Sequence, residues 1–125
     1  MGLFGNKNKK EKEYLESLNI RSMMNEDFCL EVDNVFIIMG VGTVVTGDVI
    51  SGICHTGDRA ILQTPNGNIE TRILQIDVHE NKRKSKGIAY RSEHVGISLR
   101  GVLKEQVTKG DKLFLKEKVI YEVEI

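Results

Sequence analysis

What the sequence lacks sets the first limits on its function. It has no tryptophan, one proline, and Lys plus Arg equal to Asp plus Glu at 18 each in 125 residues. A formal net charge of zero does not favour any particular kind of partner. Any charged binding surface must therefore come from local clustering of charged residues. No segment approaches the ~20 apolar residues that span a bilayer, and the chain does not begin with a signal-peptide core. We therefore expect a cytoplasmic protein with no membrane partner.

Cysteine and catalytic motifs are equally scarce. Cys29 and Cys54 stand in apolar, strand-like surroundings without the dense spacing of a secreted disulfide scaffold, which favours reduced thiols. The phosphate-binding pattern Gly-x-x-x-x-Gly-Lys-[Ser/Thr] is absent, and so are Gly-x-Ser-x-Gly and His-Glu-x-x-His. We expect no GTPase activity, no other catalysis and no cofactor.

The sequence gives little support for a metal site. His55, His79 and His94 are isolated from one another along the chain. A site would need neighbouring strands to bring Cys54-His55 against His79-Glu80, and this spacing matches no familiar zinc pattern. The interpretation that we favour is a core cysteine with surface histidines.

The larger part of the chain is rich in β-branched residues with strand-like alternation. Strands are expected at 28–32, 35–38, 41–50, 59–63, 69–78, 95–99, 112–115 and 119–125. Pro65-Asn66-Gly67-Asn68 and Thr56-Gly57-Asp58 have the composition of reversals between strands. Many short strands without intervening helices predict an all-β fold, a small closed antiparallel β-barrel in which closure removes the exposed edges.

Residues 1–27 differ in composition from the barrel at 28–125. This segment is polar, and we expect it to be a short helix or a disordered tail. Tyr14, Leu15 and Leu18 follow helical spacing, which predicts one short helix between Lys7 and Met24. Its apolar stripe is narrow, so the helix either docks on the barrel or frays.

Three glycines in the region from 35 to 47 have an expected structural role. Glycine inside a strand pattern usually marks a bulge, a sharp bend or a close approach of another backbone. Gly40, Gly42 and Gly47 fit that role, and the β-branched run Thr43-Val44-Val45-Thr46 suits a strongly bent barrel strand. We interpret the motif as architectural.

The run Val35-Phe36-Ile37-Ile38-Met39-Gly40-Val41-Gly42-Thr43-Val44-Val45-Thr46-Gly47 resembles the signature that opens the second domain of translational GTPases, elongation factor Tu above all. Later landmarks follow in the family's order at 52, 57–58, 95–101 and 107–111, so the resemblance covers roughly 28–116. It implies a barrel of the translation-factor second-domain type that binds a partner and does not catalyse.

The resemblance also implies an RNA-binding surface. In elongation factor Tu the second domain holds the aminoacylated end of transfer RNA, with acidic residues before the Val-Phe pair and apolar residues after it. Asp33 keeps one acidic position, and Phe36 and Ile38 keep the apolar surface. Asp77 aligns with the glutamate that packs on adenine.

Two positions depart from the family pattern. Val41 occupies the place of the arginine that stands between the two glycines in elongation factor Tu. Arg91-Ser92 replaces the Ala-Gly pair that precedes the later Val-Gly motif. The transfer-RNA surface is therefore only partly retained.

A local cluster of cations adds to the candidate RNA surface. Lys82, Arg83, Lys84 and Lys86 are expected on one exposed loop between two strands, with Arg91 close in sequence. Each phosphate that such side chains neutralise releases counterions, which predicts salt-sensitive and sequence-tolerant binding. A solvated hairpin tip is the competing interpretation.

Three function classes follow, in order of preference. The first is a binding module for RNA, the ribosome or a translational GTPase, which uses the cationic loop and the surface around Asp33, Phe36 and Ile38. The second is a protein-interaction domain or homo-oligomer that pairs through its C-terminal edge strand, residues 119–125. The third is an enzyme or metalloprotein.

Overall fold

The computed structural model describes residues 2–117, with side chains described from residue 9. Within that range the elements follow one another as α1 (Gly2–Ser17), α2 (Ile20–Met23), β1 (Cys29–Ile38), β2 (Gly42–Ser51), β3 (Ile53–His55), β4 (Arg59–Thr64), β5 (Gly67–Val78), η1 (His79–Asn81), β6 (Ile88–Tyr90), β7 (His94–Leu99), η2 (Lys104–Gln106) and β8 (Lys112–Leu115). The predicted C-terminal strand at 119–125 lies outside the described residues.

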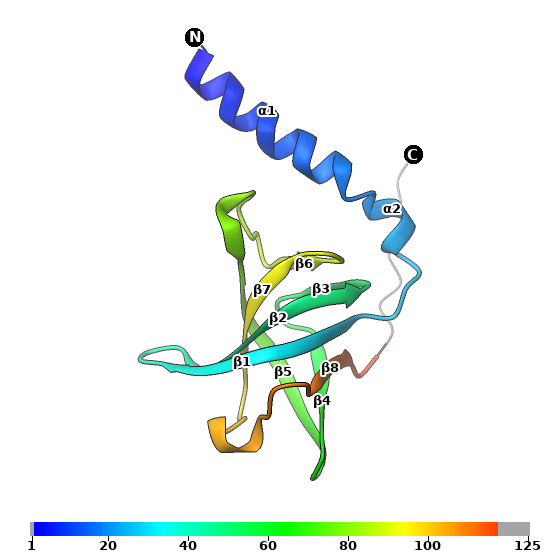
Figure 1. The fold of residues 1–125 in the computed structure, drawn as a ribbon, viewed down its shortest axis with the longest axis vertical. Coiled ribbons are helices and arrows are strands. Elements are labelled where there is room, and N and C mark those ends of the chain that lie inside the picture. Colours follow the sequence, from blue (N-terminus) through cyan, green and yellow to red (C-terminus); the bar gives the residue numbers. More distant parts are fainter. Residues whose placement is uncertain (1, 118–125) are drawn as a thin grey trace.

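Six of the strands close into a barrel in the order β1-β2-β7-β5-β4-β8, and β8 pairs with β1 to complete the ring. Every pair of neighbours in it is antiparallel. β3 and β6 form a separate two-stranded sheet. Figure 1 shows the barrel below α1, with the β1–β2 hairpin extending to one side. The predicted all-β closed antiparallel barrel with a short N-terminal helix is confirmed.

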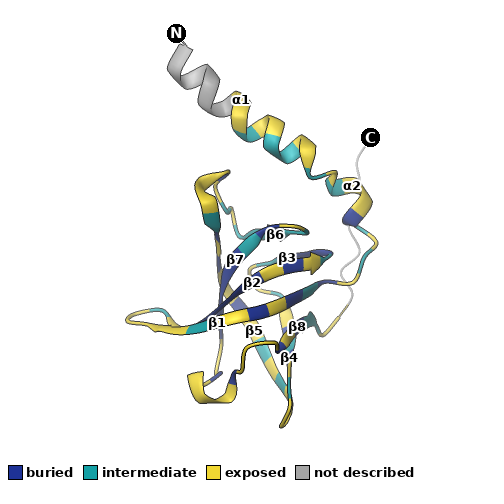
Figure 2. Ribbon diagram, in the orientation of Figure 1, coloured by how far each residue is buried: buried dark blue, intermediate teal, exposed yellow. Residues whose placement is uncertain are grey.

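The core follows from strand alternation. On β7, Val95, Ile97 and Leu99 face inward and are buried, as the period of two requires. They join one cluster with residues of the other strands, including Leu30, Val32, Val45, Val49, Leu62, Ile73 and Leu113. Figure 2 shows this buried band along β2 and β7, whereas the described part of α1 is largely exposed. Burial of this apolar surface stabilises the barrel.

A bulge joins two predicted strands into one. The sequence pattern separated 28–32 from 35–38 at the polar pair Asp33-Asn34, but β1 runs unbroken from Cys29 to Ile38. Val32 pairs with Gly47 and Asn34 with Thr46, which leaves Asp33 as the extra residue of the bulge. The polar pair therefore marks a bulge, and the bulge positions the Asp33 carboxylate.

β3 and β6 were not predicted. Each has three residues, which is too short for alternation to be recognised. The other predicted strands that the structure describes agree with it within a residue or two. Residues 41–50 correspond to β2, 69–78 to β5 and 95–99 to β7.

Gly40 and Gly47 have different structural requirements. Gly40 has φ +82°, a conformation that side-chain-bearing residues rarely adopt, and open space around it. Gly47 has no such φ, but a Cβ there would lie 1.9 Å from the carbonyl oxygen of Glu31 on the paired strand. Gly42, with φ +107°, begins β2 after the turn.

The N-terminal segment forms two helices rather than the single predicted one. α1 ends at Ser17 and α2 begins at Ile20, with Asn19 between them in the left-handed conformation at φ 54°. Asparagine is one of the few residues that adopts this conformation readily. The apolar spacing is continuous across the break, which explains why it was not predicted.

The N-terminal segment is attached to the barrel by specific contacts. The Tyr14 hydroxyl donates a hydrogen bond to Glu93 Oε2 at 2.7 Å, and the Lys82 ammonium lies 5.6 Å from the centre of the Tyr14 ring. Met23 is fully buried. Arg91 pairs with Glu26 at 2.5 Å, just before β1. These contacts hold α1 and α2 at one end of the barrel.

Tyr14→Phe is expected to release α1. It removes a hydrogen bond to a charged acceptor, so the free energy of unfolding should fall by about 1.5–3 kcal/mol. Amide exchange over residues 9–17, followed by mass spectrometry, should accelerate because the helix loses its polar anchor. Glu13→Gln, an exposed change on the same helix, is the control. Unchanged protection of α1 in Tyr14→Phe would contradict this role.

The same anchor should weaken in strong alkali. Burial and the hydrogen bond to Glu93 raise the pKa of Tyr14 above its ordinary value of 10.0. The folded state therefore keeps the phenol proton more tightly than the unfolded state does. The resulting contribution to stability is fully present below about pH 10 and is lost as the pH rises above that value.

Candidate binding cleft

The outer face of three neighbouring strands contains small and polar residues. Inward-facing residues of β7 fill the core, so Gly96 and Ser98 face outward between β2 and β5. Both are nevertheless buried, with Ser98 only 3% exposed. The wall of the barrel is therefore recessed at this point.

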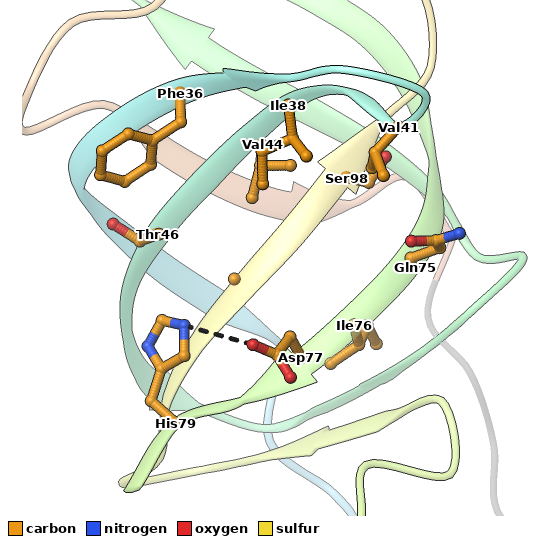
Figure 3. Close-up of a pocket in the computed structure, with 11 residues that line it drawn as sticks. Phe36, Ile38, Val41, Val44, Thr46, Gln75, Ile76, Asp77, His79 and Ser98 are labelled. Carbon is orange, nitrogen blue, oxygen red and sulfur yellow. Dashed lines mark ion pairs between the residues drawn. The ribbon is translucent and has the colours of Figure 1, made fainter.

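The recess is a cleft of about 520 Å³, within the size range of small-molecule sites. Its lining comes from the end of β1, the β1–β2 turn, β2, β5, the start of η1, and β7: Phe36, Ile38, Val41, Val44, Thr46, Gln75, Ile76, Asp77, His79, Gly96 and Ser98. We call it the β2–β7–β5 cleft. Figure 3 shows apolar side chains at the β1–β2 end, and Asp77 and His79 at the other end.

The hydroxyl of Ser98 is unusual. It is buried and has no hydrogen-bond partner among the described residues. A buried polar group without a partner costs about 1–3 kcal/mol. Ser98 lines the cleft, but its oxygen is covered in this conformation. A ligand would reach the hydroxyl once the side chain rotates toward the cleft.

Gly96 keeps the cleft open beside His79. A Cβ at Gly96 would lie 3.4 Å from His79 Nε2 and 3.5 Å from Val44 Cγ1. Both distances are ordinary van der Waals contacts, so a methyl group would fit there and would fill the space between Val44 and His79 at the base of the cleft. The absence of one leaves room for a flat group between Val44 and His79.

Asp33 is held by two contacts near the cleft. The Thr46 hydroxyl donates to Asp33 Oδ1 at 2.6 Å, and His94 Nε2 lies 2.6 Å from Asp33 Oδ2. The hydrogen bond from Thr46 and the contact with His94 lower the pKa of the Asp33 carboxyl. Asp33 is therefore a carboxylate at neutral pH.

His79 and His94, expected from the sequence to be isolated from each other, are in contact. Their Nδ1 atoms are 2.6 Å apart and their rings are centred 4.7 Å from each other. Val78 of β5 pairs with Val95 of β7, so the next residues outward, His79 and His94, lie opposite each other. The expectation of isolation was wrong because 15 residues of chain separate two strand ends that meet in the barrel.

The cationic loop is only partly exposed. The expectation that four cations share one exposed loop was wrong for Arg83, whose side chain is 3% exposed. Arg83 Nε and Nη2 donate to the Glu93 carboxylate at 2.8 and 2.7 Å, and the guanidinium also donates to the backbone carbonyls of Lys84, Ser85 and Ile88. Arg83 thus organises the loop from inside.

The lysines of the loop face outward. Lys84 and Lys86 are not buried, and Lys82 is half exposed and pairs with Glu80 at 3.3 Å. Arg91 is occupied by Glu26 and donates to the Ser22 hydroxyl at 2.9 Å. Lys84 and Lys86 therefore remain available to an anion, whereas Lys82 and the two arginines are engaged within the protein.

The apolar residues expected at the surface are exposed. Phe36 and Ile38 are 44% and 46% exposed at the rim of the cleft, on the β1 end of the hairpin. Asp77, which the resemblance aligned with the adenine-packing glutamate, also lines the cleft, whereas Thr46, Gln75 and Ser98 were not predicted. The pairing of β7 with β2 and with β5 brings these residues together.

Neither a metal-binding cluster nor a membrane-spanning helix is found in the part of the chain that the structure describes. No group of three or more His, Cys, Asp or Glu side chains in the described residues is placed to hold a metal ion. Within the same residues, no helix has the length and apolar character needed to cross a bilayer. Cys54 is buried, and burial raises the pKa of its thiol.

Comparison with known proteins shows a distant homology to translation elongation factors. The chain is 31% identical to the selenocysteine-specific elongation factor of Methanocaldococcus jannaschii over 97% of its own length. The chain is a distant homologue of these factors, and its six-stranded barrel is consistent with a module of their second-domain type. Elongation factor 1-alpha of Pyrobaculum aerophilum is 34% identical over 67% of the chain, and the apicoplast elongation factor Tu of Theileria parva is 34% identical over 70%.

This elongation-factor homologue matches only a part of each relative. The chain spans 26% of the selenocysteine-specific factor, 18% of the elongation factor 1-alpha and 20% of the apicoplast factor. The similarity falls on a portion of these proteins outside the GTPase domain. No family model matches the chain.

Proposed function

We propose that this elongation-factor homologue is a non-catalytic module that binds single-stranded RNA, with one base in the β2–β7–β5 cleft. The observation that carries the proposal is the cleft itself, with the exposed ring of Phe36 at its rim and the Ser98 hydroxyl, which has no partner among the described residues, in its wall. Bases offer both donors and acceptors at their edges and apolar faces above and below. A base therefore matches a cleft with apolar walls and a few polar groups.

The rim of the cleft supports stacking. Phe36 is 44% exposed and lies on the edge of the cleft. Stacking of a base on an aromatic ring contributes about 1–3 kcal/mol and tolerates different sequences. Ile38 and Val41 extend the apolar surface beside it.

The exposed lysines support a path for the RNA backbone. η1 begins at His79, which lines the cleft, and leads into the loop that exposes Lys84 and Lys86. Lysines near a base site can neutralise the flanking phosphates, and this contribution depends strongly on salt. Arg83 and Arg91 are left out of this path because they are paired within the protein.

The proposal is tested by fluorescence anisotropy with a short labelled single-stranded RNA. We expect a dissociation constant in roughly the micromolar range at moderate salt. Phe36→Ala should weaken binding by about fivefold or more, since it removes the stacking surface. Ser98→Ala should also weaken binding, while the free energy of unfolding without RNA stays unchanged or rises, because the unpartnered hydroxyl is removed.

Charge reversal tests the backbone path. Lys84→Glu with Lys86→Glu should weaken binding and reduce the slope of log affinity against log salt by about 0.7 for each phosphate that is no longer neutralised. Lys104→Glu with Lys109→Glu makes the same charge change at exposed positions elsewhere, and Leu103→Ala is a matched exposed apolar control for Phe36→Ala. Equal effects in the test and control variants would contradict the proposal.

The cellular location and the partner of the module are also proposed. We place the module in the cytoplasm, where its RNA would belong to the ribosome or act with a translational GTPase. The competing function, oligomerisation through residues 119–125, involves residues outside those that the structure describes. Light scattering with and without RNA separates the two, because a homo-oligomer that binds no RNA would favour the competing function.

A further inference from the structure

His79 and His94 form a pair at the edge of the cleft, within a longer chain of polar contacts. Asp33 lies 2.6 Å from His94 Nε2, the two histidine Nδ1 atoms are 2.6 Å apart, and His79 Nε2 lies 3.8 Å from Asp77 Oδ2. The chain of contacts thus runs from the β1 bulge to the cleft. The dashed line in Figure 3 marks its last contact, from His79 to Asp77.

The hydrogen positions along this chain of contacts determine which ring nitrogen carries no hydrogen. A carboxylate only accepts hydrogen bonds, so His94 Nε2 must carry a hydrogen toward Asp33. Two ring nitrogens at 2.6 Å require one hydrogen between them, not two and not none. A neutral pair has one ring hydrogen on each histidine, and both are then used. His79 Nε2 is left with a lone pair.

One added proton changes that result. A pair with three ring hydrogens still keeps one toward Asp33 and one between the Nδ1 atoms. The third is on His79 Nε2, whichever ring carries the positive charge. His79 Nε2 is therefore an acceptor in the neutral pair and a donor in the protonated pair.

This nitrogen faces the cleft. His79 lines the cleft, and its Nε2 is the atom closest to a Cβ built on Gly96, at 3.4 Å. The distance of 3.8 Å to Asp77 is too long for a hydrogen bond, so Nε2 is not committed to Asp77. A ligand over Gly96 would meet it.

We propose that the His79–His94 pair sets the hydrogen-bond polarity of the cleft and couples ligand choice to one proton. This inference rests on the proposed function. The neutral pair selects a base with an amino group facing His79, such as cytosine. The protonated pair selects a base with a carbonyl oxygen there, such as uracil. His79 is the specificity-determining residue, and Asp33 and His94 are positioning residues that act through it.

Charged groups around the pair come from each neighbouring element. Asp33 belongs to β1, Asp48 lies opposite His94 in the β2–β7 register, Asp77 belongs to β5, and Glu80 of η1 pairs with Lys82. Glu93, beside His94 in sequence, is used by Arg83. Carboxyl groups ordinarily titrate near pH 4, whereas histidine changes charge between about pH 5 and 8. That range therefore sets the two pH values at which binding is compared.

Nuclear magnetic resonance of the histidine ring nitrogens tests the hydrogen positions without any ligand. In ¹⁵N-labelled protein at about pH 8, we expect His94 with its hydrogen on Nε2 and His79 with its hydrogen on Nδ1. Asp33→Asn should remove the preference of His79 for that tautomer, whereas Asp48→Asn, the same charge change on β2 without the contact, should leave it intact. A hydrogen on His79 Nε2 in the unmodified protein under these conditions would overturn the proposal.

Binding of two oligonucleotides tests the selection. The ratio of affinities for oligo(C) and oligo(U) should fall by about three- to tenfold between roughly pH 8 and pH 5.5, the effect of one hydrogen bond gained or lost. His79→Phe should abolish this change while both oligonucleotides still bind. A ratio independent of pH in the unmodified protein, with binding intact, would overturn the selection and leave the proposed function standing. No binding of either RNA would overturn the proposed function and the selection together, and the tautomer result would stand separately.

Discussion

Arg83→Met is expected to lower the free energy of unfolding by about 3–5 kcal/mol, since it leaves Glu93 as a buried charge without its counterion. The Arg83 and Glu93 side chains are 3% and 1% exposed. The variant would remove five hydrogen bonds of the guanidinium, two to Glu93 and three to the loop carbonyls. Urea denaturation followed by circular dichroism measures the change.

The effect should not be confined to the pair itself. Glu93 also accepts hydrogen bonds from the Tyr14 hydroxyl and from the Tyr90 amide. These contacts connect α1, β6 and β7 through one carboxylate. Removal of the Arg83 guanidinium should therefore loosen the loop at 82–87 and the attachment of α1 together, which amide exchange would detect.

Two further variants separate burial of charge from simple loss of packing. Lys84→Met, next in sequence but exposed, should change stability by no more than about 0.5 kcal/mol. Arg83→Met combined with Glu93→Leu removes both charges and should be less destabilised than the sum of the single variants. If Arg83→Met instead left stability unchanged and abolished RNA binding, the buried role of Arg83 would be refuted.

Gly47→Ala is expected to destabilise the barrel by about 3 kcal/mol or more, the upper end of the usual cost of overpacking. The added Cβ would lie 1.9 Å from the Glu31 carbonyl oxygen and 2.8 Å from the carbonyl carbon. These are backbone atoms of the paired strand, so no rotation of a side chain relieves the contact. β1 and β2 would have to separate next to the bulge at Asp33.

Gly40→Ala is the matched control. The same methyl group would meet open space there, but the residue has φ +82°, so we expect a cost of only about 1–2 kcal/mol. Thermal unfolding of both variants compares the destabilisation caused by a steric contact at Gly47 with that caused by an unfavourable backbone conformation at Gly40. Equal destabilisation by the two changes would contradict the close approach at Gly47.

Gly47→Ala also reports on the cleft. Thr46, which precedes Gly47, donates to Asp33 and lines the cleft. A shift of β2 against β1 would disturb that hydrogen bond and the position of His94. We therefore expect weaker RNA binding in this variant, even at temperatures where it remains folded.

The sequence by itself determined the class of fold. Alternation of apolar residues has a period of two along each strand and depends only on neighbours in the chain, so it was enough to predict an all-β barrel. The ordered glycine landmarks, including Gly40, Gly42 and Gly47, carried the resemblance to the elongation factors. The apolar rim at Phe36 and Ile38 also followed from that resemblance.

The tertiary structure alone decided the chemistry of the site. Arg83 appears in the sequence as one of a run of cations, yet it is buried because Glu93 lies across from it inside the fold. His79 and His94 meet because the register of β5 on β7 places them opposite each other. Strand register is set by contacts between residues far apart in the chain, and no local pattern encodes it. For this reason the barrel could be predicted, and the inward arginine and the histidine pair could not.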